Sequence, residues 1–460
     1  MAIRFTNTLS GVKEDLQIPK GRPLHLFVCG PTVYDEIHIG NARTYAVFDT
    51  LSKYLRSKHI RLFYLTNITD VDDKIINRAN DEGVDAKIIA ARYIKAFRSA
   101  SKKLRLDSVD RYAPATKFIP QIIRQIQTLI TKGNAYEIKG DGWYFDLETF
   151  PDYGKLAKRT VLQAEDGTSR IDENPEKRNR GDFCLWKFSK QGEPVWKAPF
   201  GDGRPGWHIE DTAITEHFFG PQYDLHGGGS DLIFPHHEAE IAQQEAASHL
   251  KPLVKIWLHS GLVTVDGRKM SKSLGNFMTV SDFLARYSVN TFRLLVARHH
   301  YRSSINFADS LVRETETVLA IFEEILSKLA LVSKKAHATK TTIHLDEFEH
   351  LFTEAMDDDF NTPEAIAAIF KMVNMLNTNI WNLSRTDAQS ATGWIMEKLL
   401  LFGVIPRTQK IPLRIRKMTA DRERLRRHQQ FIQSDALRKK IEALGYTLDD
   451  TPLGPLIFRK

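Results

Sequence analysis

The sequence contains only two cysteines, Cys29 and Cys184, in 460 residues. Two thiols cannot build a disulfide framework, and so few suit a reducing compartment. No stretch of about 18 or more apolar residues occurs, which excludes a membrane-spanning helix. The first residues, MAIRFTNTLSGVKEDL, also lack the unbroken apolar run of a secretory signal. We therefore expect a cytoplasmic protein without a membrane segment.

A strong excess of one charge is absent from most of the chain. The formal net charge is +8, and 42% of residues are apolar, as in a globular protein of roughly two to four domains. Residues 401–460 contain 14 Lys and Arg but only 6 Asp and Glu, so they carry the entire excess. A basic segment on a neutral body indicates a polyanion partner; a solvated charged helix explains the composition equally well.

Apolar runs and amphipathic segments alternate near the N-terminus. LHLFVC, residues 24–29, predicts a buried strand, and residues 62–69 predict a second one. Between them, apolar residues recur every three or four positions over residues 38–59, which predicts a helix. Strand, helix and strand at this spacing predict a parallel α/β sheet.

The pattern changes further along the chain. Residues 113–135 predict a helix, and the segment from there to about residue 205 breaks into short pieces rich in Gly, Pro and Trp. We interpret that segment as an insertion with its own small fold. Residues 256–265, IWLHSGLVTV, predict a return to the sheet, and residues 307–400 predict a helical bundle.

A short motif follows the first predicted strand. His38-Ile39-Gly40-Asn41 stands where the predicted helix begins. Backbone N–H groups and the helix dipole favour an anion there, and Gly40 would let a nucleotide approach the backbone closely. His38 would add a hydrogen-bond donor. We interpret the motif as a phosphate site.

KMSKS, residues 269–273, is the most specific motif. VDGR precedes it and LGN follows it, which predicts a glycine-flanked loop. Lys269 and Lys272 could neutralise charge that develops on a transferred phosphoryl group. An ordinary basic surface loop is the alternative, and the upstream His-x-Gly motif argues against it.

The segment HGGGSD, residues 226–231, is a third candidate. Gly228 and its neighbours permit close contact with a flat ring, and Asp231 can accept hydrogen bonds from ribose hydroxyls. A glycine-rich turn between two elements is the alternative.

FPHHEAEI, residues 234–241, places His236 and Glu240 four residues apart, on one face of a predicted helix. Such a pair can hold a metal ion, and a solvated polar face is the alternative. A zinc site needs three or four ligands. The remaining ligands must therefore come from elsewhere in a chain with two cysteines.

In this order, these segments resemble the cysteinyl-tRNA synthetases, a family of class I aminoacyl-tRNA synthetases. The similarity runs nearly from end to end, through FVCGPTVYDEIHIGNART, NITDVDDKII, RPGWHIE, DLHGGGSDLIFPHHEAEIAQ, KMSKSLGNF and MDDDFNTPEA. It implies an α/β fold with a Rossmann-like parallel sheet. The implied segments are 1–115 and 205–306 for the two halves of the catalytic domain, 116–204 for a connective insertion, 307–400 for a helical bundle and 401–460 for a basic anticodon-binding module.

The resemblance also implies an activity. The carboxylate of L-cysteine attacks the α-phosphorus of ATP, which Mg²⁺ accompanies, and the cysteinyl group then passes to the terminal ribose of tRNA(Cys). Asn41 replaces the last residue of the family's HIGH motif, and its amide still donates hydrogen bonds. The residues implied for ATP and catalysis are His38, Gly40, Asn41, Gly228, Asp231, Lys269 and Lys272.

In this family one zinc ion per chain reads the sulfur of the substrate. Zinc favours a thiolate over a hydroxyl, whereas pocket size alone separates cysteine from serine poorly. The family ligands fall on Cys29, His236 and Glu240, and the fourth, a cysteine in HIEC, is replaced by Asp211 in HIED. We predict Asp211 as the fourth ligand. The alternative leaves it as a hydrogen-bond acceptor beside three protein ligands.

The resemblance places Thr69 and Trp207 with Cys29 and His236 in the cysteine pocket. Ordinary packing is the alternative for Thr69 and Trp207. Cys184 lies away from every ligand position, so we expect it in the core.

Two other functions remain open from the sequence. A cysteine ligase of the same fold, which joins activated cysteine to an amino sugar, would share the zinc and ATP sites. It would not need the helices after residue 310 or the basic tail. A non-catalytic RNA-binding relative is the other reading, and the intact His38, Lys269 and Lys272 count against it.

Overall fold

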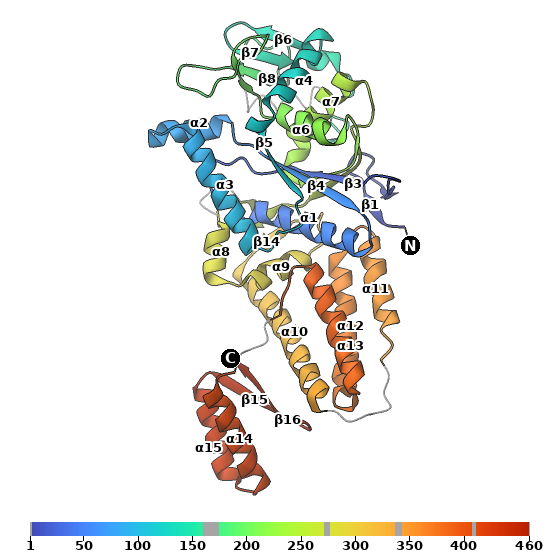
Figure 1. Ribbon diagram of the computed structural model, residues 1–460, viewed down its shortest axis with the longest axis vertical. Coiled ribbons are helices and arrows are strands. Elements are labelled where there is room, and N and C mark those ends of the chain that lie inside the picture. The colour runs from blue at the N-terminus through green and yellow to red at the C-terminus, as the bar shows by residue number, and fades with distance from the viewer. Residues whose placement is uncertain (1, 160–173, 271–276, 336–342, 407–410, 460) are drawn as a thin grey trace. The chain divides into compact units, whose positions relative to one another are not determined.

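A computed structural model describes residues 2–159, 174–270, 277–335, 343–406 and 411–459 of the chain. It divides into two compact units, which are described separately. The first comprises Met1–Asp309 with Glu354–Pro363, and the second comprises Ser310–Thr353 with Glu364–Lys460. Figure 1 shows the course of the chain through both units.

A five-stranded sheet forms the centre of the first unit, in the order β11-β10-β3-β4-β5. Every neighbouring pair is parallel, so the predicted parallel α/β sheet is confirmed. Apolar and aromatic residues predominate in β3 and β4 because both faces of such a sheet are covered. The strands are β3 (Leu24–Val28), β4 (Leu62–Ile68), β5 (Arg111–Pro114), β10 (Tyr223–Gly229) and β11 (Val254–Ser260).

Helices cover both faces of this sheet (Figure 1). One face packs on α1, and the other contributes to a core with α4, α6 and α7. The predicted helix after His38 is confirmed as α1. The helices of this unit are α1 (Ile39–Ser57), α2 (Asp73–Glu82), α3 (Ala86–Lys103), α4 (Ile119–Thr131), α6 (Ile209–Phe219), α7 (Glu238–Ser248), α8 (Val280–Arg286) and α9 (Val289–Ala297).

Two predictions of secondary structure were wrong in part. Residues 113–118 are not helical, because they finish β5 and make a short 3₁₀ turn before α4. Residues 263–265 form β12 (Val263–Val265), which leaves the central sheet. β12 pairs instead with β13 (Arg268–Lys269) and β14 (Ile305–Phe307).

The segment predicted as an insertion folds around its own antiparallel sheet, in the order β6-β7-β8-β9. A separate two-stranded sheet, β1 and β2, lies near the N-terminus. These strands are β6 (Ala135–Ile138), β7 (Gly142–Phe145), β8 (Phe183–Phe188), β9 (Gly203–Pro205), β1 (Arg4–Thr6) and β2 (Lys13–Asp15).

The second unit is mainly helical, as predicted for residues 307–400, although α10, α11 and α12 each begin or end in the first unit. A small module of two helices and a hairpin follows. The elements are α10 (Asp309–Lys335), α11 (Asp346–Asp357), α12 (Thr362–Asn379), α13 (Arg385–Leu401), α14 (Leu413–Arg427), α15 (Phe431–Ala443), β15 (Tyr446–Thr451) and β16 (Gly454–Arg459).

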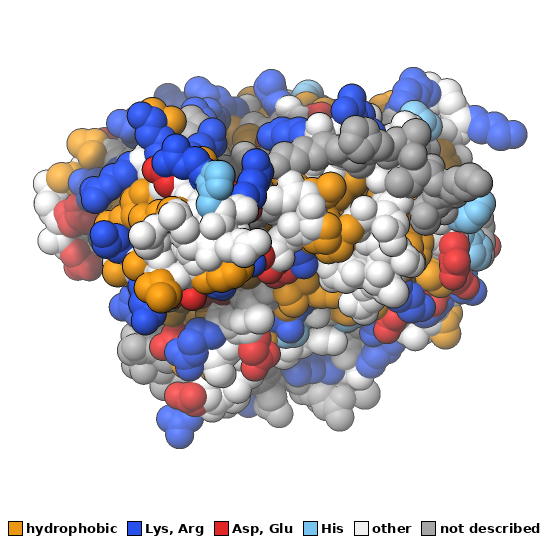
Figure 2. Space-filling model, turned by 90° about the horizontal axis from the view of Figure 1, so that it is seen from below, with side chains coloured by type: hydrophobic (Ala, Val, Ile, Leu, Met, Phe, Trp, Pro, Cys, Tyr) orange, Lys and Arg blue, Asp and Glu red, His pale blue; other side chains and the backbone are white. Residues whose placement is uncertain are grey.

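Basic side chains are frequent on the two helices of this module. Arg414, Arg416, Lys417, Arg424, Arg426 and Arg427 are exposed on α14. Figure 2 shows more Lys and Arg than acidic side chains on the face seen from below. None of the described helices is long and apolar enough to cross a bilayer.

Candidate active site and metal centre

A cavity of about 550 Å³ lies where the strands of the central sheet end. Its lining includes the residues that follow β3, β4, β10 and β11: Cys29, Thr69, Asp231 and Gly261. Strand order reverses between β3 and β10, because β4 and β5 extend the sheet on one side and β11 on the other. Ligands of parallel α/β sheets bind in the crevice at such a switch point.

The N-terminus of α1 forms one wall of this cavity. His38 caps the helix, and its Nδ1 accepts a hydrogen bond from the backbone N–H of Asn41 at 3.2 Å. Neutral His38 therefore carries its proton on Nε2. A Cβ at residue 40 would lie 2.7 Å from His38 Nδ1, so Gly40 is required beside the cap. The structure thus brings His38, Gly40 and Asn41 together in the lining.

The hairpin β12–β13 leads into the KMSKS motif. The backbone of Lys269 ends β13, and Lys272 lies outside the described residues. Met270 and Phe277 are the described residues immediately before and after residues 271–276, and both line the cavity. The Phe277 ring lies edge-on to the His38 ring, with centroids 5.3 Å apart. Phe277, the first described residue after the motif, therefore lies beside the first wall.

Asp231, which follows β10, and Gly229, the last residue of that strand, both line the cavity. A Cβ at residue 229 would lie 2.6 Å from Asp231 Oδ1, so glycine gives this carboxylate its room. Gly228 is not among the lining residues. A Cβ at residue 228 would lie 2.6 Å from Cε1 of His237, which shows that Gly228 serves the packing of a buried histidine.

The four predicted metal ligands come together beside the cavity. Ligand atoms of Cys29, Asp211, His236 and Glu240 all lie within 4.8 Å of one another, and all four side chains are buried. His236 Nε2 is 3.0 Å from Asp211 Oδ2 and 3.2 Å from Glu240 Oε1. Cys29 Sγ is 3.5 Å from Asp211 Oδ2 and 3.8 Å from Glu240 Oε1. Donors on one tetrahedral zinc ion lie about 3.3–3.8 Å apart, so this set fits zinc.

The electrostatics of the set also favour a cation. Burial raises the pKa of the Cys29 thiol, and the charges of Glu240 and Asp211 raise it further. Burial and the Asp211 charge likewise raise the pKa of Glu240. Among the described residues, histidines are the only potentially cationic side chains that pair with these two carboxylates. Asp211 Oδ1 and Glu240 Oε2 are buried without a hydrogen-bond partner. A bound metal ion would offset the cost of burying these two carboxylates, because its positive charge would compensate theirs.

A second histidine orients His236. The Nδ1 atoms of His208 and His236 lie 2.7 Å apart, and the His208 pKa is lowered by burial. If His236 offers the lone pair of Nε2 to a metal, its Nδ1 carries the proton and donates to His208. The backbone oxygen of His208 in turn accepts a hydrogen bond from Gln243 at 2.5 Å. Metal-binding histidines are commonly held in one tautomer in this way.

The sequence reasoning missed an inner donor set. Cys29 Sγ also lies 3.4 Å from His226 Nε2 and 3.1 Å from His237 Nε2. With Glu240 these residues form a second group that could hold a metal ion. The adjacent histidines of FPHH were the available signal. His226 and His237 are absent from the described lining of the cavity, whereas Cys29, Asp211 and His236 belong to it.

Thr69 and Trp207 also line the cavity. The indole of Trp207 stacks on the His236 ring, with centroids 4.4 Å apart. The Thr69 hydroxyl donates to Glu210, another buried residue that the sequence reasoning missed. Burial and the neighbouring Asp211 charge raise the Glu210 pKa, so this carboxyl is readily protonated.

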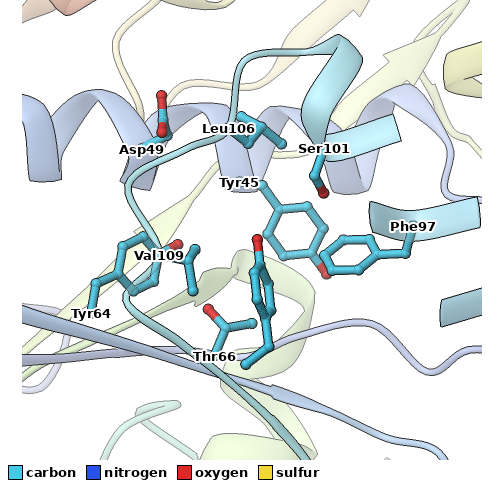
Figure 3. Close-up of a pocket in the computed structure, with 9 residues that line it drawn as sticks. Tyr45, Asp49, Tyr64, Thr66, Phe97, Ser101, Leu106 and Val109 are labelled. Carbon is cyan, nitrogen blue, oxygen red and sulfur yellow. The ribbon is translucent and has the colours of Figure 1, made fainter. Parts of the chain in front are cut away.

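A much smaller cavity of about 10 Å³ lies behind Tyr45, between α1, α3 and β4 (Figure 3). Tyr45 lines both cavities and separates them. The small cavity has room for about one water molecule, so of these two cavities only the larger one can hold a nucleotide or an amino acid. Cys184 lies in β8 of the insertion, where it is partly rather than fully buried.

Comparisons with known proteins agree with this geometry. Residues 16–317 match the family model described as the class I (C) tRNA synthetase catalytic domain, and residues 351–400 match the DALR domain. A cysteine–tRNA ligase of Caldicellulosiruptor saccharolyticus is 38% identical over 466 residues, which cover 99% of this chain and all of that protein. A cysteine–tRNA ligase of Trichlorobacter lovleyi is 40% identical and covers 99% of both chains.

Solved structures are similar in fold. A Mycobacterium tuberculosis methionyl-tRNA synthetase in complex with methionyl-adenylate aligns with a TM-score of 0.60 and 17% identity, over 83% of this chain and 90% of that one. An Agrobacterium radiobacter LeuRS, in a ternary complex with tRNA and LeuAMS, aligns with a TM-score of 0.61 and 12% identity, over 84% of each chain.

Proposed function

Because the chain belongs to the class I family of cysteinyl-tRNA synthetases, we propose that it activates L-cysteine with ATP and charges tRNA(Cys) in the cavity described above. One observation carries the assignment of the site. The donor set of Cys29, Asp211, His236 and Glu240 adjoins a cavity that is also lined by the N-terminal end of α1, where an anion is favoured.

Activation joins a carboxylate oxygen of cysteine to the α-phosphorus of ATP and releases pyrophosphate. Positioning and stabilisation of charge carry such a step. The N-terminus of α1, with His38 Nε2–H and Asn41, faces the phosphates, and Asp231 accepts from the ribose hydroxyls. Lys269 and Lys272 meet the charge that develops on the phosphates, with Mg²⁺ accompanying ATP.

One zinc ion, held by Cys29, Asp211, His236 and Glu240, would bind the substrate thiolate and distinguish it from a hydroxyl. This outer set is the one that a substrate can reach, because three of its members line the cavity. The Trp207 indole, stacked on His236, shields that side of the pocket from water. Thr69, held by Glu210, lies in the same pocket.

In the second step a hydroxyl of the terminal tRNA ribose attacks the carbonyl carbon of the adenylate, and AMP leaves. The basic module at residues 401–460 recognises the anticodon, supported by its exposed basic residues on α14. The DALR domain match and the similarity to tRNA ligases over the whole chain favour this function over an amino-sugar ligase. The reduced thiols that the site needs fit the cytoplasm.

ATP–pyrophosphate exchange tests the proposal most directly. We expect exchange to depend on cysteine, with serine, which differs by one atom, as the matched control. Metal analysis of the purified chain should find one zinc per chain, and purified tRNA(Cys) should be charged. Exchange that depends on another amino acid, or a protein without zinc, would overturn the assignment of the substrate.

A further inference from the structure

Arg43 lies in the first turns of α1 and is buried, with 1% of its surface exposed. Its Nη1 donates to the carbonyl oxygens of Gly261 at 2.7 Å and Leu262 at 3.0 Å. Its Nη2 donates to three carbonyl oxygens of the turn at residues 300–303. Burial lowers the pKa of Arg43 to about 10, so the guanidinium stays charged at neutral pH.

The backbone partners of Arg43 belong to the cavity wall. Gly261 and Leu262 line the cavity together with Gly40 and Asn41. They connect β11 to the hairpin β12–β13, and that hairpin leads directly into the KMSKS motif. Arg43 therefore joins the anion-binding end of α1 to the base of the hairpin.

Other contacts hold the same connection in place. The backbone N–H of Gly261 donates to Tyr301 at 2.7 Å. A Cβ at residue 261 would lie 2.4 Å from the carbonyl oxygen of Ser303, so the chain rests directly on the turn. The hydroxyls of Thr44 and Ser260 are 2.7 Å apart. Arg43 joins the two segments, because its Nη1 donates to residues 261–262 and its Nη2 donates to the turn at residues 300–303.

The start of α1 also holds the chain after the motif. The N–H of Ile39 donates to the carbonyl of Met278 at 3.0 Å, and the N–H of Val280 donates to Ile37 at 3.1 Å. The segments before and after the KMSKS motif are thus both tied to one helix. In the described part of these two segments, the earlier one is held by a buried charged side chain, that of Arg43.

We propose that Arg43 is a positioning residue for ATP: it sets the distance between the phosphate-binding end of α1 and the cavity wall that leads into the KMSKS motif. Arg43 does not touch the nucleotide, since both of its Nη groups donate to backbone carbonyls, its Nε is buried, and the residue is absent from the described lining of the cavity. This inference rests on the proposed function for its reaction, but its prediction for ATP binding does not require cysteine to be the substrate.

Arg43→Lys tests the inference, because a lysine ammonium cannot reach both carbonyl groups in the geometry of a guanidinium fork. We expect the Kd for ATP and the KM for ATP in pyrophosphate exchange to rise by about 10-fold. The KM for cysteine and the zinc content should stay within about twofold of the parent, because the donor set does not contact Arg43.

Arg293→Lys is the matched control. Arg293 is also 1% exposed, and it binds the same helix through Asp49 at 2.7 Å and Thr50 at 3.1 Å. Neither partner residue belongs to the lining of the large cavity. This variant should lose thermal stability to a similar degree and keep the Kd and KM for ATP of the parent.

Gly261→Ala provides a second route if Arg43→Lys fails to fold. The added Cβ should displace the same segment, so it should weaken the binding of ATP and leave the KM for cysteine unchanged. Unchanged ATP binding in a folded Arg43→Lys or Gly261→Ala protein overturns the inference. An equal loss for ATP and cysteine also overturns it, since that is the result of a purely structural role. Exchange with another amino acid in the parent would overturn the proposed substrate and leave the effect on ATP measurable.

Discussion

Replacing Asp211 by asparagine should shift the stability of the metal-free protein and its zinc affinity in opposite directions. The Asp211 charge adds to burial in raising the pKa of both Cys29 and Glu240. A neutral side chain of the same shape relieves this repulsion, so the metal-free variant should unfold at a higher temperature than the metal-free parent. Zinc should bind more weakly, because an anionic donor is lost.

The two effects differ in size. Changing a group that only hydrogen-bonds to a metal ligand costs about 10–100-fold in metal affinity. Asp211→Ala removes both donor oxygens, whereas asparagine keeps one neutral oxygen. Losing a direct ligand should cost more, so we expect Asp211→Ala to lower zinc affinity by more than about 100-fold, or about 2.7 kcal/mol. Relief of the repulsion should stabilise the metal-free protein by about 1 kcal/mol, which raises the Tm by about 2 °C in a chain of this size.

Competition with a chromophoric chelator at pH 7.5 measures the zinc affinity, and thermal unfolding in excess chelator measures the stability of the metal-free state. Asp211→Cys is the control, because a thiolate of similar reach should bind zinc at least as tightly as the parent. Zinc binding by Asp211→Ala within about twofold of the parent would show that Asp211 is no ligand. A metal-free asparagine variant that is less stable than the parent would refute the electrostatic reasoning.

Three further outcomes are expected. Lys272→Ala should slow adenylate formation by about 10²-fold with a smaller effect on cysteine affinity, and unchanged pyrophosphate exchange would contradict its role. A chain ending at Ile405 should still exchange pyrophosphate but charge tRNA poorly, and the full-length protein should lose tRNA affinity steeply with salt; equal charging by both would exclude the basic module. Burial would raise the pKa of Asp224, but hydrogen bonds from Arg22 and Lys255 hold it below the usual 3.8, so its contribution to stability is present above pH 3.8 and lost at lower pH. Asp224→Asn should therefore be less stable at pH 7 and lose part of this acid dependence in urea unfolding.

The central sheet was predictable where local and tertiary signals agree. β3 and β4 are mainly apolar because both faces of the sheet are covered, and α1 shows helical spacing of its apolar residues. The sequence prediction assigned residues 263–265, which form β12, to the central sheet. This was wrong because the composition of a strand does not indicate which strand it pairs with. The backbone at Gly261 turns away onto the 300–303 turn, and no local residue preference signals that contact.

The inner histidines were not predictable for a related reason. Three successive glycines disfavour a strand, so HGGG reads as a turn, yet residues 226–229 lie in the buried strand β10. Side chains of neighbouring elements fill the space that the glycines leave beside the strand. A Cβ at residue 227, for example, would lie 2.4 Å from the Phe48 ring of α1. The spacing of four residues already indicated His236 and Glu240 as a possible metal-binding pair. Cys29 and Asp211 were anticipated only through the resemblance, because they lie too far from that pair in sequence for any local pattern to connect them.

Asp211 also limits the kind of substrate that the buried site can accept. Cys29, Asp211 and Glu240 supply three negative charges when deprotonated, and a divalent ion leaves one of them uncompensated. The adjacent Glu210 must then stay neutral, and burial does raise its pKa. A substrate that adds a thiolate to this site has to bring a positive charge with it. The α-ammonium group of an amino acid supplies that charge, whereas a simple alkyl thiolate does not. The donor set therefore favours a thiol-bearing zwitterion, and cysteine is the smallest amino acid that meets this requirement.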